Sequence, residues 1–440
     1  MTRGWRCLWA AALAGLVLSW VGVGETQVQI PDVEAPEAPK IPIALAGFPP
    51  VVSPPPKPRD IAGEALQILT DDLKNAAIFD VLDPSFLPFE ARRLAPMEER
   101  GALAGLQSLR LQAFATGELT FQGRELILEG RLYDVATARP VGEPKRYIAE
   151  PAALRAMVHR WADEIVYRLT GERGIAQSRI AYVTVREGGA RELYVMDADG
   201  HGAEMVTANR STNLSPRWSP DGKALAYTSY RDGNPDLWIV SLETGRRVKL
   251  SSERGLNIAP AWSPDGQWLA LAMSKDGGTN LYLVRRDGSQ VRRLTSGTSI
   301  SVSPTFSPNG RQIAFTSDRG GTPQIYVMDL DGTNVRRLTF AGDYNVSPRW
   351  SPRGEKIAFV GRREGRLHIF TMSPDGSGVR PLTTGNANHE DAAWSPDGRQ
   401  LAFTSNRDGK RAIYAMLADG SRVRKLTRDG VESYLPDWSL

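Results

Sequence analysis

The chain has 440 residues, of which 41% are hydrophobic and 24% are charged, with a formal net charge of +4 and one cysteine. This length allows two or three domains, and a small net charge that is not gathered into a stripe argues against nucleic-acid binding. Cys7 alone can form neither a disulfide framework nor a cysteine-rich zinc site.

The first 24 residues differ in kind from the rest. Arg3 and Arg6 precede an apolar run over 8–23, and Gly22 and Gly24 place small residues where a signal peptidase cleaves. An uncleaved anchor is the alternative, but the run is shorter than the roughly 20 residues that span a bilayer. We therefore expect residues 1–24 to be a signal peptide and the mature chain to be exported.

Residues 25–58 are rich in proline, which cannot donate to a strand ladder, so they predict an extended mature N-terminus. The apolar run 41–48 within them predicts one strand. From Ile61 to Ala76 apolar residues recur at helical spacing, with Asp60 as the N-cap.

Residues 113–119 and 126–133 predict two strands joined near Gly123, and residues 154–169 predict a second helix that ends at Gly171. Together these elements predict a small α/β domain over 41–172. It has no glycine-rich phosphate loop, so no nucleotide cofactor is indicated.

The remainder of the chain, 176–440, is one unit repeated at intervals of 44 residues. Aromatic residues mark the repeat: Trp218, Trp262, Phe306, Trp350, Trp394 and Trp438. The first five marks are followed by Ser-Pro, one variable residue and Gly, then by short runs rich in β-branched and aromatic residues between glycine turns. Four strands per repeat of this length are typical of a β-propeller blade, with the aromatic marks in its core.

The ends of the array predict how the propeller closes. A blade begins near Ile180 without a first strand of its own, and the matching segment, 434–438, stands at the end of the sequence. We expect this last strand to complete the first blade, which closes a six-bladed ring and removes the open sheet edges.

The sequence carries no recognisable catalytic set. There is no Gly-x-Ser-x-Gly and no His-Glu-x-x-His, and the four histidines fall in unrelated registers. His389, Glu390 and Asp391 form the one dense polar triplet. It favours a partner-facing loop, with a cation site or a metal-dependent polysaccharide lyase as the alternative.

A polar register precedes each aromatic mark by five residues. Its members are Asn213, Asn257, Ser301, Asn345, His389 and Ser433. They predict a ring of polar residues at the mouth of the channel, on a face suited to docking a protein. In the other interpretation, compatible with the first, these side chains bond to the backbone of the inter-blade links. A charge at Asn257 or Asn345 is then expected to block the partner without lowering the melting temperature.

Several motifs across residues 40–440 resemble those of the TolB family, the periplasmic components of the Tol-Pal envelope system. They are Ile41-Pro-Ile-Ala, Gly130-Arg-Leu-Tyr-Asp134, Leu169-Thr-Gly-Glu172 leading into Arg179-Ile-Ala-Tyr-Val183, and Ala259-Pro-Ala-Trp-Ser-Pro-Asp-Gly266. The junction over 169–172, after an α/β domain, is the most specific of them.

The resemblance implies a scaffold that is not an enzyme and needs no cofactor or metal. In the family the propeller face holds the peptidoglycan-associated lipoprotein Pal, and the mature N-terminus reaches the inner-membrane protein TolA. These links support outer-membrane integrity and invagination during cell division. We expect the same partners here for a monomeric chain.

The family's Pal-contacting loop, of His-Asn-Gly-Ala-Pro type, matches residues 256–260. Asn257 and Ala259 carry over, whereas Leu256 replaces the histidine, and Val302 and Ser303 stand where the family often has Thr-Glu. The predicted partner-binding residues are Asn213, Asn257, Ala259, Val302, Ser303, Asn345, His389, Glu390, Asp391 and Ser433.

Overall fold

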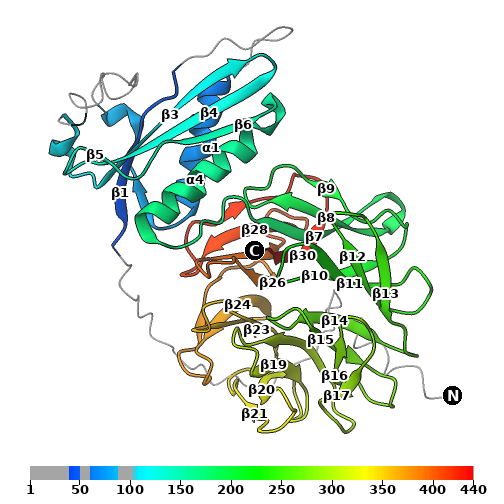
Figure 1. Cartoon of the computed structure of the whole chain (residues 1–440). Coiled ribbons are helices and arrows are strands. Elements are labelled where there is room, and N and C mark those ends of the chain that lie inside the picture. The colour runs from blue at the N-terminus through cyan, green and yellow to red at the C-terminus, as the bar shows by residue number, and fades with distance from the viewer. Residues whose placement is uncertain (1–38, 50–59, 88–102, 104, 440) are drawn as a thin grey trace. The chain divides into compact units, whose positions relative to one another are not determined.

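In the computed structural model, residues 39–49, 60–87, 103 and 105–439 are described (Figure 1). The predicted signal peptide and most of the Pro-rich segment lie outside these residues. The described residues fall into two compact units. The first contains Val183–Leu193 and Val206–Ala392, and the second contains 39–182, Tyr194–Met205 and 393–439. Within the described ranges, no helix is long and apolar enough to cross a membrane.

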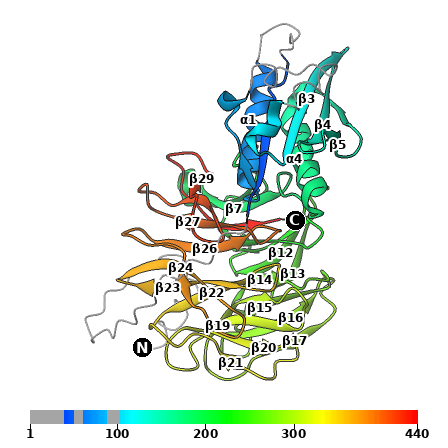
Figure 2. The same cartoon turned by 90° about the vertical axis from the view of Figure 1, so that its left-hand side faces the viewer.

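The α/β region of the second unit is a mixed sheet with two helices that pack against each other (Figure 2). Its strands and helices are β1 (Ile41–Leu45), α1 (Ile61–Asn75), β2 (Phe79–Val81), β3 (Ala113–Gln122), β4 (Glu125–Asp134), β5 (Arg139–Pro140), β6 (Lys145–Ala149) and α4 (Leu154–Thr170). Short 3₁₀ segments are η2 (Pro84–Phe86), η3 (Gln107–Leu109), η4 (Pro151–Ala153) and, in the propeller, η5 (Glu187–Gly189).

The sheet order is β2-β1-β3-β4-β5, with β6 also paired to β4. Strands β1 and β2 run parallel and are joined through α1, so they form a βαβ unit. Strands β3 and β4 form a long antiparallel hairpin that turns at Gly123, whose φ is 62°. The sheet therefore presents one face to α1 and α4, where Trp161 is fully buried.

Both predicted helices are confirmed, together with their ends. Asp60 accepts a hydrogen bond from the Gly63 backbone N–H at 2.8 Å, as an N-cap does. Helix α4 ends at Gly171, which adopts the left-handed conformation that glycine tolerates (φ 72°). The short strands β2, β5 and β6 were not predicted.

The propeller consists of six four-stranded sheets. Its strands are β7 (Arg179–Val185), β8 (Arg191–Asp197), β9 (Glu204–Met205), β10 (Asn213–Trp218), β11 (Ala224–Ser229), β12 (Asp236–Ser241), β13 (Arg247–Ser251), β14 (Asn257–Trp262), β15 (Trp268–Met273), β16 (Asn280–Arg285), β17 (Val291–Arg293), β18 (Ser301–Phe306), β19 (Gln312–Ser317), β20 (Gln324–Asp329), β21 (Arg336–Arg337), β22 (Asn345–Trp350), β23 (Ile357–Arg363), β24 (Arg366–Met372), β25 (Arg380–Pro381), β26 (His389–Trp394), β27 (Gln400–Ser405), β28 (Ala412–Leu417), β29 (Arg424–Lys425) and β30 (Ser433–Trp438).

Ring closure by the last strand is confirmed, because the sheet of the first blade has the order β30-β7-β8-β9. Trp438 Nε1 donates to Ser178 Oγ at 2.8 Å, and the Ser439 backbone N–H donates to the Arg179 carbonyl at 2.8 Å. These bonds join residues that are 260 positions apart in the sequence. The first blade is therefore completed from the opposite end of the repeat array.

The aromatic marks lie in or against the core, as predicted, and one of them is only partly buried. Trp218, Trp262, Phe306, Trp394 and Trp438 are all buried. Trp350 is only partly buried, and its Nε1 donates to the Gly354 carbonyl at 3.3 Å. The repeat therefore packs mainly through one aromatic ring per blade.

Candidate functional site

The polar register predicted at the channel mouth begins the first strand of each blade, and its side chains are buried. Asn213, Asn257, Ser301, Asn345, His389 and Ser433 are each at most 6% exposed. Asn257 Nδ2 donates to the carbonyls of Glu253 (2.7 Å) and Pro235 (3.2 Å), and Asn345 Nδ2 donates to that of Ala341 (2.9 Å). The structure thus gives Asn257 and Asn345 the role of bonding to the links.

This burial corrects the expectation for charged variants at these positions. A charge at Asn257 would replace a side chain that is fully buried and bonded to carbonyl groups. Leaving such groups unpaired costs about 1 to 3 kcal/mol, so the variant would lower stability as well as any binding. Binding must be tested at a neighbouring position that solvent reaches.

Such a position lies two residues further along each first strand. Its residues are Ser215, Ala259, Ser303, Ser347, Asp391 and Leu435, and each has φ between 52° and 56°. In β10, β14, β18 and β22 the pairing register shifts at this point, as at a β-bulge. All six residues are partly exposed, so we name them the bulge positions.

The bulge positions of the first unit lie on strands that meet one another. β14 contacts β10 and β18, and β18 contacts β22, so these first strands are neighbours from blade to blade. Three predicted partner-binding residues, Ala259, Ser303 and Asp391, occupy bulge positions. Glu390 beside them is also partly exposed, whereas Val302 is buried. Non-glycine residues in the left-handed conformation are strained, and such strain often marks functional sites.

The triplet over 389–391 is not a converging set of ligands. His389 is 1% exposed, and its ring lies against that of His368 with centroids 5.5 Å apart. Burial raises the pKa of Tyr344, and the nearby carboxylates of Glu390 and Asp391 raise it further. Among the described residues, the groups whose ligand atoms converge do not include this triplet.

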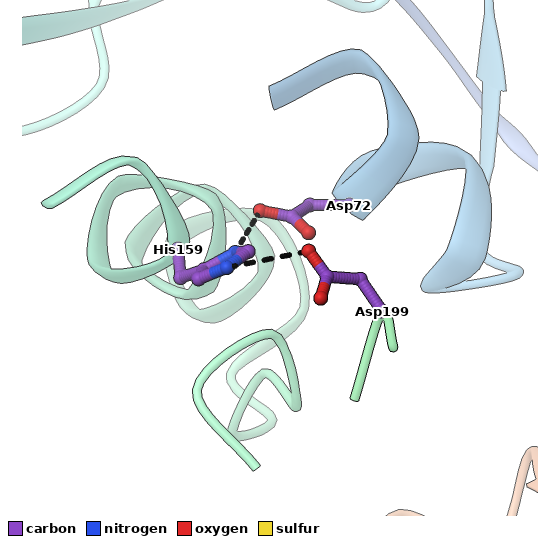
Figure 3. Close-up of side chains that lie close together, drawn as sticks. All are labelled: Asp72, His159 and Asp199. Carbon is purple, nitrogen blue, oxygen red and sulfur yellow. Dashed lines mark hydrogen bonds and ion pairs between the residues drawn. The ribbon is translucent and has the colours of Figure 1, made fainter. Parts of the chain in front are cut away.

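A different cluster, in the second unit, brings together three potential metal ligands from distant parts of the sequence (Figure 3). Asp72 lies on α1, His159 on α4, and Asp199 in the turn between β8 and β9. His159 Nδ1 lies 2.7 Å from Asp72 Oδ2, and His159 Nε2 lies 3.5 Å from Asp199 Oδ2. The imidazole lies between two carboxylates and is 4% exposed, so it has almost no contact with bulk water.

Opposing effects set the protonation of this cluster. Burial raises the pKa of Asp72 to about 6, although the hydrogen bond and charge of His159 work against the rise. Burial alone would lower the pKa of His159, but the hydrogen bond and charge of Asp72, together with Asp199, raise it above its ordinary value. The pair therefore binds a proton more tightly than isolated side chains do.

Asp199 behaves differently because more donors face it. Its burial is outweighed by the His201 backbone N–H, by Arg155 and by His159, so its pKa is lowered. The His201 N–H donates to Oδ1 at 3.0 Å, while Arg155 Nη2 donates to Oδ2. Asp199 is therefore an ionised carboxylate with a fixed cation already beside it.

The donor set fits a hydrogen-bonded ionic network better than a metal centre. A zinc-like ion needs three or four ligands, and an imidazole offers an ion one nitrogen at a time. Nδ1 is already bonded to Asp72 and Asp199 is already paired with Arg155, so an ion would have to break these pairs, and the Arg155 guanidinium would repel it. The expectation that the chain binds no metal therefore remains a prediction, and this geometry is consistent with it.

The sequence alone did not single out this cluster because Asp199 belongs to the repeat. Asp287, Asp331, Asp375 and Asp419 stand in the same register, and each accepts the N–H two residues later, as Asp199 does. Asp199 differs from these residues because its second carboxylate oxygen faces His159 and Arg155. The distinguishing partner is His159, which lies on a helix outside the repeat, so the repeat pattern does not reveal it.

These features define a class: a small α/β domain followed by a six-bladed propeller whose last strand completes the first blade. Residues 30–141 match the family model of the TolB amino-terminal domain. Residues 166–390 and 344–440 match that of the TolB beta propeller domain. The chain therefore belongs to the TolB family.

Relatives and a solved structure agree with this membership. The chain is 39% identical over 214 residues to the Tol-Pal system protein TolB of Syntrophus aciditrophicus, covering 48% of this chain and 47% of that one. It is 35% identical over 192 residues to that of Roseobacter denitrificans, covering 43% and 42%. The chain thus spans under half the length of these curated relatives.

The structural match is more extensive. The crystal structure of TolB from Acinetobacter baumannii superimposes with a TM-score of 0.77 at 27% sequence identity, covering 92% of this chain and 97% of that one. The likeness includes both the α/β region and the propeller.

Proposed function

We propose that this chain is a periplasmic protein-binding scaffold of a Tol-Pal system and is not an enzyme. The observation that carries the proposal is the pair of family matches, which together extend over most of the chain from residue 30 to residue 440. The bulge positions add strained, partly exposed residues on the first strand of each blade, of the kind that suits docking. In this role the propeller binds a Pal-like peptidoglycan-associated lipoprotein.

The proposal extends to a second partner. The mature N-terminal segment binds a TolA-like inner-membrane protein, so that the chain links the envelope layers and supports outer-membrane integrity during division. A signal peptide over residues 1–24 delivers the chain to that compartment. The scaffold works as a monomer and uses no cofactor.

Binding of the Pal-like lipoprotein is tested by calorimetric titration of its soluble domain into the purified chain. Ala259→Arg places a large charged side chain at a bulge position where a non-glycine residue already has a φ of 53°. We expect this variant to weaken binding at least tenfold, or about 1.4 kcal/mol. Val291→Arg, on an exposed site of the outer strand β17, is the matched control and should bind normally.

The two outcomes that oppose the proposal are separable. If the unaltered chain does not bind the lipoprotein domain, the scaffold function is wrong. If Ala259→Arg binds as tightly as the unaltered chain, the function stands but the bulge positions are not the docking surface.

A further inference from the structure

His159 lies between two carboxylates, in a position that favours its charged form. A neutral imidazole carries one N–H, so it can donate from one nitrogen and presents a lone pair at the other. Here both nitrogens face carboxylate oxygens, Nδ1 towards Asp72 and Nε2 towards Asp199 (Figure 3). The imidazolium is attracted to both carboxylates, whereas the neutral ring is repelled by one of them.

The three side chains come from segments that the fold must hold together. Asp72 and His159 join α1 to α4, and Asp199 joins both helices to the β8–β9 turn of the first blade. This turn is itself fixed, since the His201 N–H donates to Asp199 and the Asp197 N–H donates to the His201 carbonyl at 2.8 Å. A change at the imidazole therefore acts on a rigid turn on one side and on two helices on the other.

We propose that His159 is a proton-dependent clasp: when charged it fastens helices α1 and α4 to the β8–β9 turn, and loss of its proton loosens that attachment. This inference does not rest on the proposed function. It gives the chain a sensor of pH in the region where the α/β elements meet the first blade.

Other charged groups surround the clasp and must be counted. They are Asp71 and Asp72 on α1, Arg155 and Asp163 on α4, Asp197, Asp199 and His201 at the β8–β9 turn, and Arg424 on β29. Arg155 pairs with Asp199, and Asp163 accepts the backbone N–H groups of Ala176 and Gln177. Asp72 consequently remains the principal carboxylate partner of the imidazole.

The direction of the pH effect follows from proton linkage. The pKa of His159 is higher in the folded chain, so its contribution to stability is complete below 6.5 and is lost as the pH rises through the folded value. The pKa of Asp72 is raised from 3.8 to about 6, so its ionisation also lowers stability as the pH rises across that range. The lowered pKa of Asp199 acts in the opposite direction, but only in acid near and below 3.8. The clasp should therefore be tight in mild acid and weaken above neutrality.

The test follows the imidazole directly in the full chain. The chain has four histidines, so their ring resonances can be resolved in an NMR titration, with His159 assigned by its loss in His159→Gln. We expect the His159 midpoint to lie above 6.5 and to move down in Asp199→Asn. In parallel, hydrogen exchange of the 197–201 turn, corrected for the intrinsic rate, should increase between about pH 6 and pH 8, around the region where histidine titrates.

The repeat supplies a matched control. Asp287→Asn alters the same turn position two blades further on, where the carboxylate accepts the Ser289 N–H at 2.9 Å and meets no histidine. It should leave the His159 midpoint and the exchange of the 197–201 turn unchanged. A His159 midpoint at or below 6.5, or a midpoint unmoved by Asp199→Asn, would overturn the proposal. If the hydrogen-exchange protection of the 197–201 turn does not change with pH, then His159 is charged but does not hold the turn. This result would also overturn the proposal.

Discussion

The aromatic marks show what one side chain contributes to the propeller. Trp262 packs among residues of two consecutive blades, including Ala226 and Leu271, and its Nε1 donates to the Arg217 carbonyl at 3.2 Å. Arg286 lies over the ring, 5.4 Å from its centroid. The ring therefore fills the space between two sheets and pairs its one polar atom.

Trp262→Ala should lower the free energy of unfolding by about 3 to 5 kcal/mol, because it leaves a large cavity between the blades. Urea unfolding followed by circular dichroism measures the change. Val291→Ala, on an exposed site of β17, should change stability by less than about 0.5 kcal/mol. Equal midpoints for Trp262→Ala and the unaltered chain would contradict the core assignment.

The role of a residue can be predicted from the sequence where every repeat gives that position the same role. It cannot be predicted where one copy of a repeated residue makes an additional contact. The aromatic register predicted the core positions because the same side-chain packing recurs in every blade. Asp199 looks like its counterpart Asp287 in sequence, yet one of its oxygens also faces His159. A contact between segments 40 residues apart along the chain leaves no periodic trace.

At the scale of elements, the end of α1 shows how a helix terminus is satisfied from outside. The last carbonyls of a helix have no intrahelical donor. Gln400 Nε2, at the start of β27, donates to the Asn75 carbonyl at 2.6 Å, and Arg422 Nη1 donates to that of Lys74 at 3.3 Å. Gln400 Oε1 also accepts from Arg424 Nη2 at 2.8 Å. One buried amide thus pairs a helix end and an arginine.

Gln400→Leu should destabilise the chain by about 1 to 3 kcal/mol, because the Asn75 carbonyl and Arg424 lose a buried partner. The matched control is Gln312→Leu, at the equivalent position of β19, where the amide donates to Asp329 at 3.1 Å and is partly exposed. The control should cost under about 1 kcal/mol. Thermal unfolding compares the two, and an equal cost would show that pairing with α1 contributes nothing.

Elements were predictable in proportion to their length and regularity. The two helices have long amphipathic patterns and clear caps, so their ends could be read from Asp60 and Gly171. Strand β2 has three residues, and β6 carries exposed Lys145 and Arg146, so neither shows an alternating pattern. Both exist because they pair with neighbours in the sheet, which a local pattern does not report.

The bulge positions illustrate a limit of a different kind. A non-glycine residue with positive φ is not expected from an alternating strand sequence. The structure nevertheless repeats this conformation at the same place in all six first strands. The family resemblance points to Ala259 and Ser303 but offers no geometric reason for them. The fold supplies one, since the bulge turns these residues out of the ladder.

At the scale of the whole molecule, the propeller depends on β30, the last strand in sequence order. Strand β30 lies at the edge of the first blade and pairs with β7, which would otherwise present an open edge. Trp438 is buried there and contacts the cluster that contains Ile180 and Tyr182. Among the described residues β30 is the strand that completes this sheet, so closure couples the two ends of the array.

Deletion of residues 433–440 should therefore abolish the cooperative thermal transition and produce aggregates on size-exclusion chromatography, because it exposes the β7 edge and the apolar surface beneath Trp438. A synthetic peptide of the deleted sequence, added to the truncated chain, should restore the transition in a saturable manner. The same peptide with Trp438→Ala should not, since it retains the strand but lacks the ring that packs against Ile180. Unchanged melting of the truncated chain would mean that the six sheets hold together without this closure, and that the strand pairing seen here is not what stabilises the ring.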